Sequence, residues 1–333
     1  MQGENKNRAK RFLAGITRNS TVLTGVVLIL LIVVAAVFSP YFLSIFNLQS
    51  LMRDIAFIGI IATGQSLLLL IGELDLSVGK IATLSGILGG LLMTQLSVNP
   101  TLALVIGALS GIVLGCINGL LITKLKINAM VATIGMQGVY GGITMVITKG
   151  QAITGIPENI LFIGKNNFLG MPIPFWIAIV ILAVIVLFVL RTKTGRYIYA
   201  IGNSREAAKI MGIKVDRIRL LIYGIVGLLS SIAGMLYVAR LGSAQATIGT
   251  NWPMNSIAAC VIGGVLLTGG VGNPVGSFLG AAIICVISNV IVLFGVNIYW
   301  QEAVSGIVVV VAIGLPSFVG ILREKKKLRR SEE

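Results

Sequence analysis

Residues 191–219, RTKTGRYIYAIGNSREAAKIMGIKVDRIR, form a basic island between apolar runs that are long enough to span a bilayer. The island holds eight Lys and Arg residues, and loops this basic stay on the cytoplasmic side of a membrane. In its middle, a segment bounded by glycines predicts a short helix over Ser204–Met211. A short helix presented there suits docking to a soluble partner better than forming a pore. The stretch therefore indicates a transporter that is driven by a separate protein.

The composition of the rest of the chain supports a membrane protein. Of the 333 residues, 56% are hydrophobic and only 11% are charged. No soluble domain of this size needs so much apolar surface, so we expect an all-α polytopic membrane protein. The net charge of +15 could suggest nucleic acid, but the basic residues cluster in short segments between apolar runs. They are better explained as topology signals, and we expect no nucleic-acid partner.

At about 20 residues per span, the apolar runs predict ten transmembrane helices. They cover 21–39, 51–71, 77–96, 101–122, 129–147, 174–190, 217–239, 254–270, 275–294 and 299–320.

Orientation follows from the Lys and Arg residues. The segments expected inside hold 22 of the 26, and they are 1–20, 72–80, 123–128, 191–219 and 321–333. Both termini are therefore expected in the cytoplasm. We expect a basic N-terminus (1–20), a transmembrane domain (21–320) and a basic tail (321–333), in a multi-pass membrane protein.

The longest segment expected outside the cell is 148–172. It is mostly polar and rich in glycine and proline. It could carry a short re-entrant or surface helix around Pro157–Ile163. The segment is either a plain connector or part of a docking face for an external partner.

Several kinds of chemistry are excluded by residue types that are missing or isolated. The chain has no histidine, so histidine-based catalysis and histidine-ligated metal sites are excluded. Cys116, Cys260 and Cys285 each lie in an apolar segment and form no CxxC pair, so we interpret them as small hydrophobic residues. No GxxxxGK[ST] motif occurs, and Gly263–Gly276 is better explained as a helix break and turn. We expect a non-catalytic chain that binds no metal or cofactor, with ATP and Mg²⁺ held by a partner.

Glycines recur every four residues in the fourth predicted span, at Gly107, Gly111, Gly115 and Gly119, and the ninth span repeats the spacing at Gly276 and Gly280. Such ladders allow another helix to approach closely. They predict tight packing of these two helices and say nothing about a substrate.

Acidic residues in the apolar regions are few and lie near the ends of predicted spans. Asp75 precedes Leu-Ser-Val-Gly at the start of the third span. A carboxylate there can cap the free N–H groups of a helix. With Ser77 and Gly79, Asp75 is either a helix cap or part of a gate or partner contact. No series of buried acids crosses the midplane, as a proton-coupled carrier would need.

Five segments resemble the permease subunits of bacterial ATP-binding-cassette importers of monosaccharides such as ribose, galactose and xylose. They are GELDLSVGKIATLSG (72–86), INAMVATIGM (127–136), GRYIYAIGNSREAAKIMGIKVDRIRLLIYGIVGLLSSIAG (195–234), IAACVIGGVLLTGGVGNPVGSFLGA (257–281) and NVIVLFGVNIYWQ (289–301). The resemblance implies a ten-helix permease, similar to those of type II importers, that pairs with itself. It also implies a cytoplasmic ATPase and a periplasmic or lipid-anchored sugar-binding protein as partners.

The resemblance places the contact with the ATPase in the basic island. The matching residues are Gly202, Arg205, Glu206, Ala207, Ala208 and Gly212. Gly212 also suits the end of a helix, where only glycine adopts the left-handed conformation without cost. The chain departs from many sugar permeases at Trp252–Asn255, where an acidic pair is usual and none occurs here.

A path for a neutral polyol needs hydroxyl and amide side chains rather than charges. The candidates are Ser66, Ser85, Asn118, Thr133, Gln137 and Asn289, and each could instead form a hydrogen bond between helices. The alternative function is a secondary carrier or channel for a small neutral solute that needs no ATPase. The missing acid relay and the basic island favour the ATP-driven importer.

Overall fold

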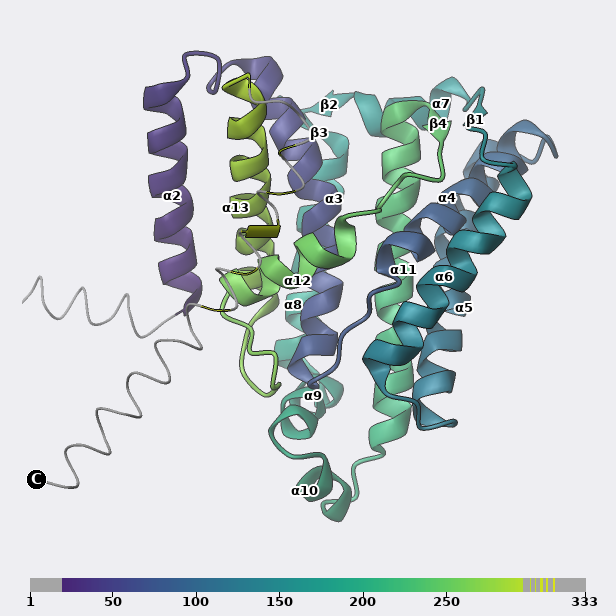
Figure 1. Cartoon of the computed structure of the whole chain (residues 1–333), viewed down its shortest axis with the longest axis vertical. Coiled ribbons are helices and arrows are strands. Elements are labelled where there is room, and N and C mark those ends of the chain that lie inside the picture. Colours follow the sequence, from purple (N-terminus) through teal and green to yellow (C-terminus); the bar gives the residue numbers. More distant parts are fainter. Residues whose placement is uncertain are drawn as a thin grey trace, which may run out of the picture.

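A computed structural model of the chain shows helices standing side by side along one long axis (Figure 1). The structure describes residues 20–295 and, beyond them, residues 300, 303, 306, 307, 310 and 314. Three predicted segments lie outside the described residues, apart from Ser20 and those six: the N-terminal segment 1–20, the tenth span 299–320 and the basic tail 321–333.

Among the described residues, seven helices are long and apolar enough to cross a membrane. They are α2 (Ser20–Phe38), α3 (Ile45–Leu70), α5 (Pro100–Thr123), α6 (Ala129–Thr148), α8 (Ile173–Arg191), α11 (Val215–Leu241) and α13 (Pro274–Leu293). Seven of the predicted spans are confirmed, with boundaries that differ by a few residues.

Local sequence explains where several of these helices begin. The side chain of Asn99 accepts hydrogen bonds from the N–H groups of Thr101 and Leu102, and Pro100 occupies the first turn of α5. Asn128 caps α6 in the same way through the N–H of Met130. Asparagine is a favoured cap, and proline costs nothing in the first turn because its missing N–H would be unpaired there.

Two apolar helices in the described region are shorter, α4 (Val78–Thr94) and α12 (Trp252–Ile262). The predicted span 254–270 is wrong, because α12 has 11 residues and so extends only about 16 Å, roughly half of the hydrocarbon thickness. The chain turns instead at Gly264, Gly269 and Gly270, whose φ angles are +85°, +92° and +74°. The expected helix break and turn in this glycine-rich segment is confirmed.

The glycine ladders pack helices together, as predicted. On α5, a Cβ on Gly111 or Gly115 would overlap a backbone carbonyl of α11, at Gly227 and Tyr223 respectively. On α13, Gly280 faces the backbone of α12 in the same way. Close backbone approach of this kind is how helices associate in lipid, where no hydrophobic effect drives them together.

The segments 148–172 and 191–219 lie at opposite ends of the helices (Figure 1). At one end, here called the α7 end, are α7 (Glu158–Lys165), β2 (Asn167–Phe168), β3 (Met171–Pro172) and the antiparallel pair of β1 (Ile153–Thr154) and β4 (Ser243–Ala244). The short helix expected around Pro157–Ile163 is confirmed as α7.

At the other end, called the α10 end, are α9 (Lys193–Asn203) and α10 (Arg205–Ile210). The single helix predicted over Ser204–Met211 needs correction, because the island contains two helices and α10 is shorter than expected. Ser204 is the residue at which α9 ends and α10 begins, since it caps both.

Candidate functional site

A cavity of about 620 Å³ lies between α3, α11, α12 and α13. Its α3 residues run from Ser50 to Ile58, in the first half of that helix, and Tyr237 and Leu241 belong to the last turns of α11. Both positions lie toward the α7 end (Figure 1). The volume falls in the range of pockets that hold small organic ligands.

Three aromatic rings form one side of this cavity. Phe57 and Trp252 stack at 6.3 Å between centroids with an interplanar angle of 13°. Tyr237 meets both rings edge-on, at 5.0 Å from Phe57 and 5.5 Å from Trp252. Packing of each ring against the other two fixes their orientation, and it leaves Phe57 only 1% and Trp252 only 8% exposed.

Neutral polar side chains complete the lining. They include Gln245, Thr247, Thr250, Asn251, Asn255 and Ser288. Amides and hydroxyls of this kind both donate and accept hydrogen bonds. Trp252 and Asn255 come from the segment in which the sequence has no acidic pair, so this part of the wall is uncharged.

Asp54 is the one charged residue among the described residues that line the cavity. Its Oδ1 is 2.5 Å from Nη1 of Arg240, and Arg240 also lies over the ring of Phe57, at 5.6 Å from the centroid. The arginine therefore balances the charge of Asp54, and its own charge faces a ring that stabilises a cation.

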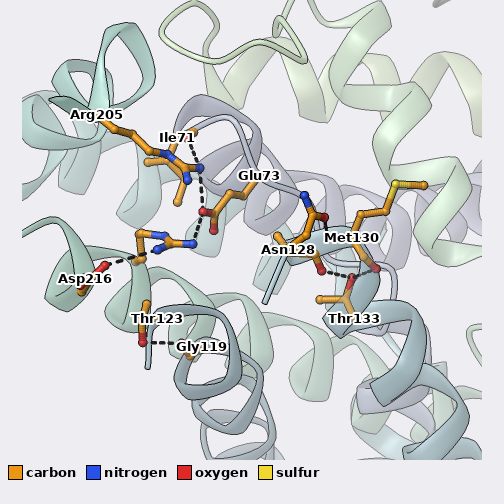
Figure 2. Close-up of polar contacts among 11 residues, drawn as sticks. Ile71, Glu73, Gly119, Thr123, Asn128, Met130, Thr133, Arg205 and Asp216 are labelled. Atoms are coloured by element: carbon orange, nitrogen blue, oxygen red, sulfur yellow. Dashed lines mark hydrogen bonds and ion pairs between the residues drawn. The ribbon is translucent and has the colours of Figure 1, made fainter. Parts of the chain in front are cut away.

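One of the six predicted path residues lines this cavity. Asn289 exchanges two amide hydrogen bonds with Asn47, of 2.8 and 3.0 Å, which tie α13 to α3. Thr133 and Ser66 donate to carbonyls of their own helices, as Figure 2 shows for Thr133. Ser85 accepts from Ser110 across the α4–α5 contact. Gln137 lies half-buried on α6 and outside the cavity lining.

The sixth, Asn118, joins a buried polar network with two other predicted residues. Its Nδ2 donates to Oδ2 of Asp75 at 3.0 Å and to Oγ of Ser77 at 2.7 Å. Its Oδ1 accepts from the hydroxyl of Tyr140 at 3.0 Å. Tyr140 and Gln65, which donates to the carbonyl of Asp75, were not singled out from the sequence. The one feature of the sequence that could have identified Tyr140 and Gln65 is that each is a polar side chain within a run of apolar residues.

The geometry around Asp75 is that of a helix start. Its Oδ1 accepts from both the N–H and the hydroxyl of Ser77, each at 2.7 Å, and Ser77 is the cap residue of α4. Gly79 follows in the first turn, where a Cβ would overlap the carbonyl of Gly249. Asp75 and Ser77 thus tie the start of α4 to Asn118 of α5, and Gly79 lets it approach the loop that precedes α12.

At the α10 end, α10 is a short and largely exposed helix. The hydroxyl of Ser204 accepts from the N–H of Ala207, at 3.2 Å, and Ala208 is the buried residue of the helix. Gly212 follows with a φ of +79°, which confirms the expected left-handed stop. The neighbouring side chains of Ile210 and Met211 are 88% and 66% exposed.

By contrast, α9 is held firmly against the helices. A Cβ on Gly202 would overlap both the carbonyl of Leu70 and the N–H of Gly270, and these two groups hydrogen-bond each other at 2.9 Å. The hydroxyl of Tyr199 donates to the carbonyl of Gly272 at 2.9 Å. Burial raises the pKa of Tyr199, so its hydroxyl stays protonated as a donor.

Glu73 joins α10 to the loop between α3 and α4. Its Oε1 is 2.7 Å from Nη2 of Arg205 and 2.6 Å from Nη2 of Arg219. Arg205 also donates to the carbonyl of Ile71 at 3.3 Å. In Figure 2, Arg205 reaches Glu73 from above, and Asp216 lies below Glu73 in the same view. Asp216 pairs with Arg219, the second arginine that contacts Glu73.

Comparisons with known proteins agree on the class of protein. Residues 47–313 match the family described as branched-chain amino acid transport system / permease component. The ribose import permease protein RbsC of Bacillus subtilis (strain 168) is 42% identical, over 86% of this chain and 89% of that protein. RbsC of Escherichia coli (strain K12) is 36% identical, over 86% and 91%.

A more distant relative has a different named cargo. The autoinducer 2 import system permease protein LsrC of Enterobacter sp. (strain 638) is 33% identical, over 86% of this chain and 82% of that protein. No solved structure matches the chain. With residues 47–313 matched, the chain belongs to the branched-chain amino acid transport system permease family, and it is a multi-pass, non-catalytic permease component of a bacterial ATP-binding-cassette importer in the inner membrane.

Proposed function

We propose that this permease imports a neutral monosaccharide or a closely related small polyol. The observation that carries the proposal is the cavity at the α7 end, with its aromatic side and its neutral amides and hydroxyls. The C–H face of a sugar ring packs well on aromatic rings, and its hydroxyls match side chains that both donate and accept. The names of the ribose import relatives support the same class of cargo.

The partners follow from the two ends of the molecule. A cytoplasmic ATPase, which binds ATP and Mg²⁺, docks at the α10 end, where Ile210 and Met211 are exposed and where the six predicted coupling residues lie. A periplasmic or lipid-anchored sugar-binding protein delivers the cargo at the α7 end. Two copies of the chain pair in the lipid membrane, each with ten spans and both termini in the cytoplasm, in the manner of type II importers.

Alternating access requires a site that opens first to one side and then to the other. The cavity lies toward the α7 end, and α12 with the glycine-rich turn after it lies between the cavity and α9 (Figure 1). Because Gly270 packs against Gly202 of α9 and Gly272 accepts a hydrogen bond from Tyr199 of α9, a displacement of α9 by the ATPase reaches α12 through this turn. In this mechanism, Asp75, Ser77 and Gly79 fix the start of α4 beside the path.

The test replaces one aromatic wall of the cavity. We expect Trp252→Ala to lower the initial rate of sugar uptake by about tenfold, because the loss of a packed aromatic surface weakens binding by roughly 1 kcal/mol or more. Uptake of labelled ribose, xylose and galactose is measured in proteoliposomes that contain the permease, its ATPase and its binding protein.

The matched control is Trp176→Ala. Trp176 also lies near the α7 end, on α8, where its Nε1 donates to the carbonyl of Phe168, but it is not among the residues that line the cavity. This control is expected to transport normally. Equal uptake by the Trp252 variant and the control, at the same amount of protein, would refute the assignment of the cavity.

A further inference from the structure

Glu73 and Asp75 are the two buried acidic residues in the described part of the chain, and of these Glu73 is the one that pairs with arginines. Its side chain is 3% exposed, and it pairs with two arginines, Arg219, which is 12% exposed, and Arg205, which is 42% exposed. Removing a carboxylate from water is costly unless it is paired and hydrogen-bonded. Arg219, the more buried of the two arginines, compensates the charge of Glu73 inside the protein, and Arg205 links the same carboxylate to α10.

The two arginines come from the segment that the ATPase contacts. Arg205 is the first residue of α10. Arg219 is the last residue of the basic island and lies in the second turn of α11. Glu73 lies on the other side of this contact, in the loop that joins α3 to α4. One buried carboxylate thus connects the exposed docking helix to the membrane-embedded helices.

The loop beyond Glu73 is itself firmly held. Two residues further on, Asp75 accepts three hydrogen bonds from the side chains and backbone of Ser77 and Asn118. Asn118 continues the network to Tyr140 on α6. Because of these hydrogen bonds, a displacement of Glu73 is expected to displace the start of α4, α5 and α6 as well.

Breaking a buried ion pair is strongly unfavourable, because it leaves an uncompensated charge away from water. When α10 moves, Glu73 must follow Arg205 or lose that pairing. By contrast, the neighbouring pair of Arg219 with Asp216 is at the surface, at 3.3 Å with Asp216 63% exposed, and a surface pair of this kind contributes little.

We propose that Glu73 is a positioning residue that transmits displacement of α10 by the ATPase to α4, α5 and α6, and so couples ATP hydrolysis to transport. The inference rests on the proposed function of an ATP-driven importer. It assigns to Glu73 a role in which neither ATP nor the cargo is touched.

The test measures ATP hydrolysis and sugar uptake in the same proteoliposomes, with the permease, its ATPase and its binding protein. We expect the Glu73→Gln variant to bind the ATPase and to support ATP hydrolysis. The number of sugars imported per ATP should fall by about tenfold, because the free energy lost with a charge-assisted hydrogen bond corresponds to a factor of about that size. The matched control is Asp216→Asn, which also removes an acidic partner of Arg219, and it is expected to keep the wild-type ratio.

A second variant decides the matter if Glu73→Gln does not reach the membrane. Arg205→Gln leaves Glu73 paired with Arg219, so the carboxylate stays compensated, and we expect the same fall in sugars per ATP with the ATPase still bound. In the double variant Glu73→Gln with Arg205→Gln, the two losses should not add, because each substitution removes the same ion pair between Arg205 and Glu73.

The inference is overturned by a wild-type ratio in Arg205→Gln, by additive effects in the combined variant, or by an equal loss in Asp216→Asn. Wild-type proteoliposomes that import no sugar with ATP would refute the proposed function instead. The two failures are therefore distinguishable.

Discussion

Gly202 and Gly212 differ in what a side chain would meet, although both lie in the segment assigned to the ATPase. Gly202 has no room for a Cβ, because the carbonyl of Leu70 and the N–H of Gly270 occupy that space. Gly212 has nothing within 4 Å of a Cβ and instead needs its φ of +79°. The first glycine fixes α9 against the helices, and the second ends the turn after α10.

This difference predicts unequal losses of stability. Gly202→Ala is expected to lower the free energy of unfolding by about 1–3 kcal/mol or more, because the inserted methyl group forces two backbones apart. Gly212→Ala is expected to cost about 1 kcal/mol, the strain of a left-handed alanine. Thermal unfolding in detergent measures both, and the Gly202 variant should unfold several degrees lower. A similar midpoint for the two variants would contradict the packing role of Gly202.

Among the elements, α7 and α10 are the short helices that mark the two ends of the molecule. A residue that favours a helix start precedes each of them: Pro157 precedes α7, and Ser204 precedes α10. Their positions at opposite ends agree with the distribution of Lys and Arg in the sequence, which predicts that the α10 end lies in the cytoplasm.

The orientation predicts which introduced cysteines react from outside the cell. In a variant without the three native cysteines, Asn159→Cys on α7 is expected to react with a membrane-impermeant thiol reagent in whole cells. Lys209→Cys on α10 is expected to react only after the membrane is opened. Both positions are exposed in the structure, so burial cannot explain a difference. Reaction of Lys209→Cys alone in intact cells would reverse the topology.

Much of this element order could be predicted from the sequence, because the long helices are mostly apolar runs, and α3, α5, α6 and α13 have a Ser or Asn cap at their start. The span predicted over 254–270 was too long, although the glycines of Gly263–Gly276 themselves predicted a helix break. The residues of this stretch are apolar enough for lipid, and the positive φ angles of Gly264 and Gly269 show where the chain turns instead. Likewise, α9 was missed because it is amphipathic and packs on one face only, through Ile198 and Ile201.

The candidate site was predictable to a smaller extent. Asp75, Ser77 and Asn118 stood out as polar groups in apolar surroundings, and the structure brings them into one network. The cavity depends on long-range packing of α3, α11, α12 and α13, which no local pattern encodes, and only Asn289 was chosen in advance. Glu73 lies near the end of a predicted span, but its two arginine partners lie more than 130 residues away, so no local pattern predicts the pairing.

At the scale of the whole molecule, the two ends carry different functions. The cavity of aromatic and neutral polar side chains lies toward the α7 end, and the exposed helix α10 with its buried ion pairs lies at the other. We expect a chain of this design to move its cargo only when a partner acts on the α10 end. The central claim is therefore that transport depends on ATP hydrolysis by a separate subunit.

The most direct test is sugar uptake into proteoliposomes with ATP enclosed on the α10 side. The account predicts that the permease with its ATPase and binding protein accumulates labelled ribose or a related neutral sugar, and that omission of the ATPase abolishes both hydrolysis and uptake. Uptake by the permease alone, driven by a proton or sodium gradient without ATP, would contradict the account and establish a secondary carrier.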